Sequence, residues 1–131
     1  MRILVVDDSG YMRTFLRMHL AQAGHEALEG APESLFHVLQ TLRGARPDLL
    51  LTDYEMPAFT GEDLIRSVRE DPFLKTMPIL VISAHREAEL VERLSRWDLC
   101  AYLLKPITPE SLLQAVERAK GLLGEAAAPD A

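Results

Sequence analysis

The stretch "RILVVDDSG" at residues 2–10 decides the fold, because a strongly β-prone run ends abruptly in two adjacent carboxylates. Ile3–Val6 is apolar at every position, as in a strand of a sheet that is covered on both faces. Neighbouring side chains of a strand point to opposite faces, so Asp7 and Asp8 cannot both be explained as solvent-facing alternation. The pair indicates that something at the end of this strand requires negative charge.

Further β-like runs follow along the chain at His25–Leu28, Leu49–Thr52, Ile79–Ser83 and Ala101–Leu104. Between and after them, apolar residues recur at helical spacing. The five sets are Met12, Leu16 and Leu20; Leu35, Leu39 and Leu42; Leu64, Ile65 and Val68; Leu90, Leu94 and Trp97; Leu112, Val116, Ala119 and Leu123. The sequence therefore predicts five strand–helix repeats.

This alternation predicts an α/β fold in which a (βα)5 chain forms a doubly wound, five-stranded parallel sheet between two helical layers. The length of 131 residues fits one domain, which we expect to span residues 1–123. The tail "GEAAAPDA" at 124–131 lacks periodicity, and we expect it to be disordered or to begin a linker. In such a sheet, ligands bind beyond the carboxyl ends of the strands.

Composition excludes several classes of function. The net charge of −6, from 14 basic and 20 acidic residues, argues against direct nucleic-acid binding. Cys100 is the only cysteine, which excludes an internal disulfide and a cysteine-based zinc site and fits a reducing compartment. The sequence has neither a secretory signal pattern nor an 18-residue apolar stretch, so we expect no membrane association and a cytoplasmic location.

Polar residues end the four strongest strands. Asp7 and Asp8 follow the first strand, Asp53 follows the third, Ser83 ends the fourth, and Lys105 follows the fifth. Three carboxylates at one edge raise each other's pKa unless a cation joins them. Mg²⁺ prefers such oxygen ligands, and Mn²⁺ is a possible substitute. With one amine and one hydroxyl, this set could stabilise a transferring phosphoryl group.

Four motifs carry a family resemblance: "VVDDS", "LLLTDYEMPAFTGEDL", "PILVISA" and "AYLLKP". In this order and at this spacing they resemble the response regulator receiver domains of the CheY-like type, over roughly residues 2–121. The resemblance implies a flavodoxin-like, CheY-like three-layer sandwich with strand order 2-1-3-4-5. It also implies a signalling switch of a two-component phosphorelay that catalyses its own phosphorylation and slow dephosphorylation, not a metabolic enzyme.

The resemblance assigns roles to particular residues. Asp53 would be the phosphoacceptor, taking the phosphoryl group from a sensor histidine kinase or a histidine phosphotransfer protein. Asp7, Asp8, Asp53 and the backbone carbonyl of Glu55 would hold Mg²⁺, with Asp8 bound directly and Asp7 partly through water. Lys105 would contact the phosphoryl group.

Other roles concern switching and lifetime. Ser83 would be the switch hydroxyl and Tyr102 the aromatic switch residue, and the peptide bond before Pro106 would be cis. Glu55 and His85, two residues after Asp53 and Ser83, would tune the lifetime of the phosphorylated state. The fourth helix, fifth strand and fifth helix would form the output face, in a monomer or a phosphorylation-linked dimer whose target the sequence does not identify.

One pair departs from the family pattern. Receivers commonly carry Gly-Ala between the fourth helix and the fifth strand, where this chain has Asp98-Leu99. Aspartate tolerates left-handed geometry better than most residues, so the fold is compatible with the change. The face bearing Arg93, Arg96 and Trp97 is altered, which leaves the partner open.

Alternatives remain at this point. Asp7 and Asp8 could cap a helix, Asp53 could belong to a turn, and Tyr102 could simply pack at a sheet edge. The chain could also be a haloacid-dehalogenase-type aspartyl phosphatase, a flavodoxin-like FMN binder, or a docking receiver used without phosphorylation. His19, His25 and His37 have no metal-ligand spacing, and we predict that they lie on the surface.

Overall fold

The computed structural model describes residues 1–127, in which five strands alternate with five helices. The elements are β1 (Arg2–Val6), α1 (Gly10–Gln22), β2 (Glu26–Glu29), α2 (Leu35–Ala45), β3 (Leu49–Asp53), α3 (Gly61–Glu70), β4 (Ile79–Ser83), α4 (Ala88–Ser95), β5 (Ala101–Leu104) and α5 (Pro109–Ala127).

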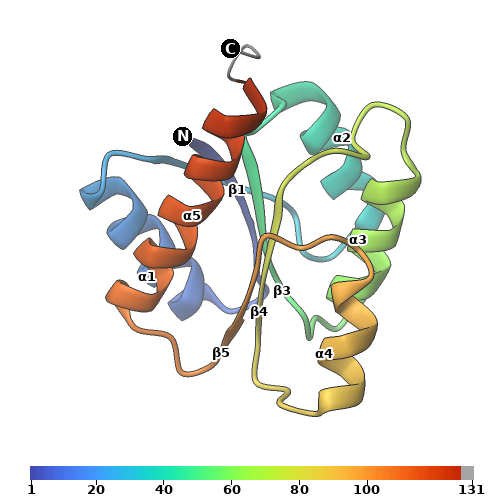
Figure 1. The fold of residues 1–131 in the computed structure, drawn as a ribbon. Helices are drawn as coiled ribbons and strands as arrows, with labels where there is room; N and C mark the ends of the chain where they lie inside the picture. Colours follow the sequence, from blue (N-terminus) through green and yellow to red (C-terminus); the bar gives the residue numbers. More distant parts are fainter. Residues whose placement is uncertain (128–131) are drawn as a thin grey trace.

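The strands form one parallel sheet in the order β2-β1-β3-β4-β5, so the predicted α/β sandwich and its strand order are confirmed. Helices α1 and α5 cover one face of the sheet, and α2, α3 and α4 cover the other (Figure 1). All strands run in the same direction, which brings their carboxyl ends to the lower edge of the molecule in Figure 1. Strands β2 and β5 form the two edges of the sheet.

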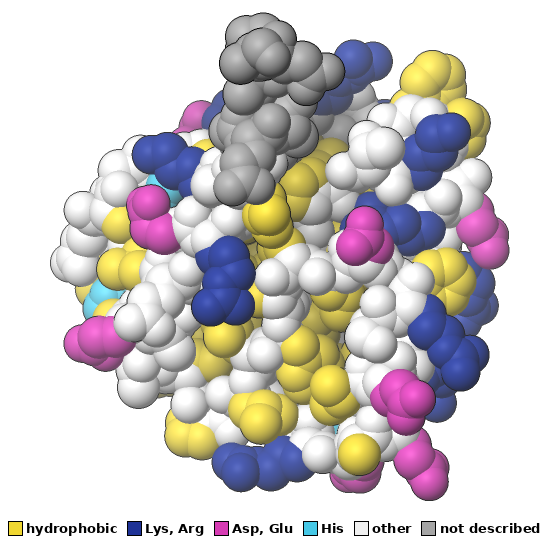
Figure 2. Space-filling view, in the orientation of Figure 1, with side chains coloured by type: hydrophobic (Ala, Val, Ile, Leu, Met, Phe, Trp, Pro, Cys, Tyr) yellow, Lys and Arg dark blue, Asp and Glu magenta, His cyan; other side chains and the backbone are white. Residues whose placement is uncertain are grey.

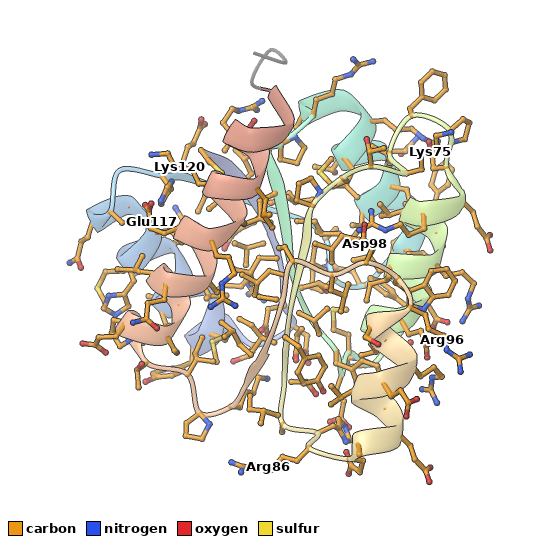
Figure 3. The ribbon with its side chains drawn as sticks, viewed as in Figure 1. Lys75, Arg86, Arg96, Asp98, Glu117 and Lys120 are labelled. Carbon is orange, nitrogen blue, oxygen red and sulfur yellow. The ribbon has the colours of Figure 1, made fainter. Side chains whose placement is uncertain are left out.

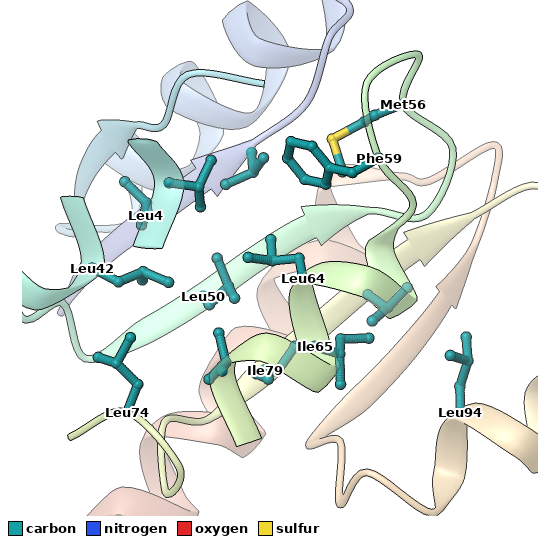
Figure 4. Packing of buried hydrophobic residues seen from close by; sticks show 14 of the residues in the cluster. Leu4, Leu42, Leu50, Met56, Phe59, Leu64, Ile65, Leu74, Ile79 and Leu94 are labelled. Atoms are coloured by element: carbon teal, nitrogen blue, oxygen red, sulfur yellow. The ribbon is translucent and has the colours of Figure 1, made fainter. Parts of the chain in front are cut away.

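Two apolar layers hold the sandwich together. One lies between the sheet and α2, α3 and α4, and Figure 4 shows its packing, with Leu50 and Ile79 of the sheet facing Leu64 and Ile65 of α3. The other lies beneath α1 and α5. All five residues of β3 and all five of β4 are buried. Covering on both faces explains why these strands are continuously apolar in sequence rather than alternating.

Several boundaries differ from the predicted ones. Strand β2 begins at Glu26, one residue later than expected, and α4 ends at Ser95, so Trp97 follows the helix. Helix α5 continues to Ala127, past the expected boundary at 123, because nothing in "GEAA" interrupts a helix. Residues 128–131, the rest of the expected tail, lie outside the described residues. No helix within the described part of the chain has the length and apolar character needed to cross a membrane.

The turn before β5 has the geometry that aspartate was expected to tolerate. Asp98 adopts φ 59°, in the left-handed region where glycine is otherwise favoured. The departure from Gly-Ala therefore leaves the path of the chain intact. Arg46, at the end of α2, adopts a similar left-handed conformation, which the sequence did not reveal.

His25 corrects one of the predictions. Its side chain is buried, with only 7% of its surface exposed, because the chain joins the sheet here: Glu26 donates its N–H to the carbonyl of Met1. The terminal amine of Met1 lies 2.9 Å from Nδ1 of His25. Burial lowers the pKa of the imidazole. The expected surface position was wrong because His25 precedes a strand whose sequence is too polar to reveal an inward-facing residue.

Candidate functional site

Three carboxylates meet at the carboxyl ends of β1 and β3. Asp7, Asp8 and Asp53 each place a carboxylate oxygen within 4.8 Å of the others. Asp7 and Asp53 are buried, whereas Asp8 is exposed. Strands β1 and β3 pair in parallel, so their carboxyl ends lie side by side. Asp53 is therefore close to Asp7 and Asp8 although it is more than forty positions away in the sequence. The acidic cluster expected from the sequence is thus formed.

Asp7 has one satisfied and one unsatisfied oxygen. Its Oδ1 accepts the N–H of Ser9 at 2.8 Å, while its Oδ2 is buried without a partner among the described residues. Burial is the largest effect on this group and raises the pKa of Asp7 to about 6. An unpaired buried carboxylate oxygen is costly, and a cation would supply the missing interaction. The donor set therefore fits a hard divalent metal ion such as Mg²⁺.

Lys105 extends from the end of β5 to the acidic cluster. Its Nζ lies 3.2 Å from Oδ1 of Asp53. Burial raises the pKa of the Asp53 carboxyl, and the ammonium of Lys105 opposes that effect. The N–H of Lys105 donates to the carbonyl of Ser83 at 2.8 Å, which ties the ends of β4 and β5 together. The peptide bond between Lys105 and Pro106 is cis.

Ser83, His85 and Tyr102 form a connected set beside this pair. The buried hydroxyl of Ser83 accepts the N–H of His85 at 3.0 Å, and its own O–H donates to none of the described residues. The hydroxyl of Tyr102 donates to the carbonyl of His85 at 2.8 Å. His85 therefore joins the serine to the tyrosine through its backbone.

The side chain of His85 contacts two carboxylates. Its Nε2 pairs with Glu55, and its Nδ1 lies 3.3 Å from Glu87. Hydrogen bonding to Glu55 is the main cause that raises the pKa of His85. The ring also meets Tyr54 edge-on, with centroids 5.4 Å apart. The two residues expected to flank the phosphoryl group thus contact each other, and Glu87 is a third member that the sequence did not single out.

Two further residues support the site and were not predicted. Arg13, in the first turn of α1, donates from Nη1 to the carbonyl of Asp7 at 2.8 Å. Gly61 donates its N–H to the carbonyl of Tyr54, and a Cβ built on it would lie 2.8 Å from the carbonyl oxygen of Asp53. Only a residue without a side chain fits behind the acceptor. An "F-T-G" turn after a strand hints at such a close approach, but it does not give the contact.

The helix-cap alternative for the acidic pair does not hold. Ser9 is the N-cap of α1, and its side chain accepts the N–H of Met12. Asp7 and Asp8 thus precede the cap and face the cluster with Asp53. Asp53 is the last residue of β3, so its position belongs to the strand and not to a turn.

Comparison with known proteins defines the class. A model of the response regulator receiver domain matches residues 3–117, and the chain belongs to this family. It is therefore a CheY-like signalling switch of two-component systems rather than an enzyme. The order of its site residues already differed from that of the dehalogenase-type phosphatases, and membership of the receiver family leaves that alternative without support.

Individual relatives match most of the chain. The chemotaxis protein CheY of Pseudomonas aeruginosa is 32% identical over 118 residues, which cover 90% of this chain and 94% of that protein. The sensor histidine kinase TmoS of Ectopseudomonas mendocina is 35% identical over 113 residues, which cover 85% of this chain but 11% of the kinase. Among solved structures, CheY4 of Vibrio cholerae superposes with a TM-score of 0.81 at 30% identity, covering 90% of this chain and 97% of that one.

Proposed function

We propose that this receiver takes a phosphoryl group onto Asp53 and uses the resulting acyl phosphate to switch its output face. The proposal rests on the position of the Asp53 carboxylate. This carboxylate clusters with those of Asp7 and Asp8, and it lies 3.2 Å from the ammonium of Lys105. A carboxylate held beside a fixed cation is equipped to attack phosphorus and to tolerate the charge that develops on the phosphoryl oxygens.

In the proposed step, a carboxylate oxygen of Asp53 attacks the phosphorus of a phosphohistidine. The new O–P bond forms as the P–N bond breaks, and the electron pair of that bond leaves with the donor imidazole. Lys105 faces a phosphoryl oxygen, and the O–H of Ser83, which donates to no described residue, is available to a second oxygen. Positioning and charge neutralisation supply most of the catalysis in such transfers.

Mg²⁺ is the proposed cofactor, held by the carboxylates of Asp7, Asp8 and Asp53 and by the backbone carbonyl of Glu55. When bound, it would neutralise the negative charge shared between the acids and the phosphoryl group. The unpaired buried Oδ2 of Asp7 supports this choice. Glu55 and Asp8 line one pocket, which supports including Glu55 among the proposed ligands.

Switching would pass through Ser83 and Tyr102. If the serine moves toward the phosphoryl group, its hydrogen bond to the His85 N–H must change, and the carbonyl of His85 holds the Tyr102 hydroxyl. Tyr102 lies on β5, between α4 and α5. Figure 2 looks onto this face and shows hydrophobic side chains along its centre, with basic and acidic side chains on both sides. We assign this face, formed by α4, β5 and α5, as the output surface.

The proposed partner upstream is a sensor histidine kinase or a histidine phosphotransfer protein, and the proposed compartment is the cytoplasm, where such donors are phosphorylated. A receiver that docks without phosphorylation is the second candidate. It would be favoured only by failure of the site to accept a phosphoryl group, because all the residues needed for acceptance are present.

The deciding experiment is incubation with Mg²⁺ and acetyl phosphate, followed by intact mass. We expect one added phosphoryl group that is lost in mild alkali, as an acyl phosphate is. Asp53→Asn should remove it. Asp48 immediately precedes β3, at the end of the strand opposite Asp53. Asp48→Asn is therefore the matched control and should leave the added phosphoryl group unchanged. Absence of the adduct in the unaltered protein, with phosphohistidine donors as well, would favour the docking function.

A further inference from the structure

A groove lies at the end of the sheet opposite the phosphoacceptor. It has a volume of about 410 Å³ and is formed by the loop between α3 and β4, the loop between α4 and β5, and the part of α5 that bears Ala119 and Leu122. This volume falls in the range of small-molecule sites, about 300–1,000 Å³. No role proposed for Asp53 or its partners uses this region.

The walls of the groove are mainly apolar. Met77, Pro78, Leu99 and Leu122 contribute to them, together with the half-buried Cys100. Leu122 is 48% exposed, so part of the apolar wall is open to solvent. Leu99 stands where receivers commonly carry a small alanine, and its larger side chain extends the wall. The groove is therefore partly a product of this chain's own departure from the family pattern.

The groove also contains a cation, Arg69, whose hydrogen bonds go to backbone carbonyls. Arg69 donates to four backbone carbonyls: to Trp97 and Met77 at 2.7 and 2.6 Å, and to Lys75 and Asp98 at 3.1 Å each. A guanidinium has five N–H groups, so four bonds leave one N–H on Nη2 unused. Among the side chains described, residues 1–122, no carboxylate lies within 4.0 Å of Arg69. Burial of this charge also lowers its pKa.

The rim adds a second cation and one anion. Lys75 and Asp98 line the groove, and Figure 3 shows both on the same side of α5, whereas Lys120 projects from the other side. Lys75 forms no ion pair within the described residues. Two positive charges against one negative charge leave the polar part of the groove net positive. A bound group with one negative charge would therefore complement it.

We propose that this groove binds a small amphipathic anion: a single carboxylate or sulfonate joined to an aromatic or short aliphatic group. The apolar part would lie against Leu99 and Leu122, and the acidic group would meet the free N–H of Arg69 and the ammonium of Lys75. Because Arg69 offers only one free N–H, it cannot form the bidentate pair that makes arginine sites tight. A single contact at each cation makes this a site of modest affinity.

The probe is 2-naphthoate, titrated into the ¹⁵N-labelled protein and followed by amide chemical shifts, with 2-naphthamide as the uncharged match. We expect saturable shifts at the amides of Met77, Leu99 and Cys100 with the acid, and at least about tenfold weaker binding of the amide, because it loses the charge-assisted contacts with both Arg69 and Lys75. Because Cys100 is the only cysteine, the rate of its alkylation by iodoacetamide is a second readout, and the bound acid should slow it.

Lys75→Glu and Leu122→Glu should each weaken binding of the acid about tenfold, since each places a negative charge at the rim. Lys120→Glu, an equally exposed charge reversal on the far side of α5, is the matched control and should leave affinity unchanged. These exposed positions avoid Arg69, whose loss would break four backbone contacts and endanger folding.

Three results would overturn the site. Shifts that do not saturate would do so, as would equal affinity for acid and amide. Shifts confined to the amides around Asp53 and Lys105 would place the anion at the phosphoryl site instead. Because none of these readouts requires phosphorylation, failure here leaves the role of Asp53 untouched, and failure of phosphorylation leaves the groove untouched.

Discussion

The Lys105 ammonium and the Asp53 carboxylate lie 3.2 Å apart, although they end strands that are not adjacent in the sheet. Strand β4 separates β3 from β5, so Lys105 reaches across the end of β4 to meet its partner. The tie between the Lys105 N–H and the Ser83 carbonyl fixes the point from which it reaches.

Lys105→Met tests whether this contact acts on the reaction. The substitution keeps most of the length of the side chain and removes the charge, so phosphorylation by acetyl phosphate should slow on the order of 10²-fold, as for loss of one preorganised charge-stabilising donor. The rate of appearance of the phosphorylated mass measures it. Lys120→Met is the control, and an equal loss there would assign the effect to general charge instead.

Asp8→Asn should weaken Mg²⁺ binding by at least about tenfold, because a charged ligand is lost, and Asp7→Asn should weaken it less if Asp7 acts partly through water. Isothermal titration with MgCl₂ gives both affinities. Equal losses would contradict this division of roles. The pKa of Asp7, raised to about 6, adds a pH test: a proton competes with the metal below that pH, so affinity should fall on acidification from neutrality.

Gly61→Ala should destabilise the fold by about 2 kcal/mol, because the new Cβ would lie 2.8 Å from the Asp53 carbonyl oxygen and 2.9 Å from Cα of Tyr54. Displacing that backbone should also slow phosphorylation. Gly44→Ala in α2 is a matched control with nothing within 4 Å of its Cβ, and it should stabilise by about 0.5–1 kcal/mol. Urea unfolding of both variants measures the difference; a neutral Gly61→Ala would show that the loop yields.

Glu55→Ala and His85→Ala should each change the lifetime of the phosphorylated state, because the pair lies beside the site and its loss alters the access of water. The half-life of the phosphorylated protein after removal of the donor is the measurement. Glu87 contacts the other ring nitrogen of His85. Glu87→Ala therefore shows whether the effect belongs to the contact between Glu55 and His85 or to any carboxylate beside His85. Unchanged half-lives in both Glu55→Ala and His85→Ala would exclude a tuning role.

Arg43→Met should lower stability at neutral pH and have little effect in acid. Hydrogen bonds from Arg43, and then from the Phe73 N–H, hold the pKa of the Asp71 carboxyl below its usual value. A lowered carboxyl pKa contributes stability above the unfolded value, near 4, and that contribution is lost as pH falls toward the folded value. The urea midpoints of Arg43→Met and of the unaltered protein should differ at neutral pH and converge at about pH 3. A pH-independent difference would assign the effect to packing of the Arg43 stem.

The sequence was most informative where physical constraints are strict. A buried parallel strand must be apolar on both faces, so β3 and β4 were placed to within one residue, and their ends gave Asp53 and Ser83. Parallel strand ends converge, so the acidic cluster followed directly. The edge strand β2 is short and polar, and there the prediction was displaced by one residue and missed the burial of His25.

Contacts made through backbone groups were not predictable. Gly61 matters because of a carbonyl, Arg69 because it donates to four carbonyls, and Arg13 because it donates to one. Every residue carries the same backbone acceptor, so side-chain patterns cannot indicate which carbonyl a long basic residue will find. Glu87 was missed for a related reason: its partner His85 comes from a loop whose path the sequence does not determine.

The two edges of the sheet are unlike. Strand β2 carries Glu26 and Glu29, both exposed, whereas β5 presents Ala101–Leu104, with no charged side chain. Charged residues on an edge strand oppose the addition of another strand, and uncharged ones do not. Two copies joined at β5 would therefore expose only the glutamate-bearing edges, at which further growth is disfavoured. Charge therefore guards the β2 edge of the sheet against the addition of a further strand, and the β5 edge lacks this protection.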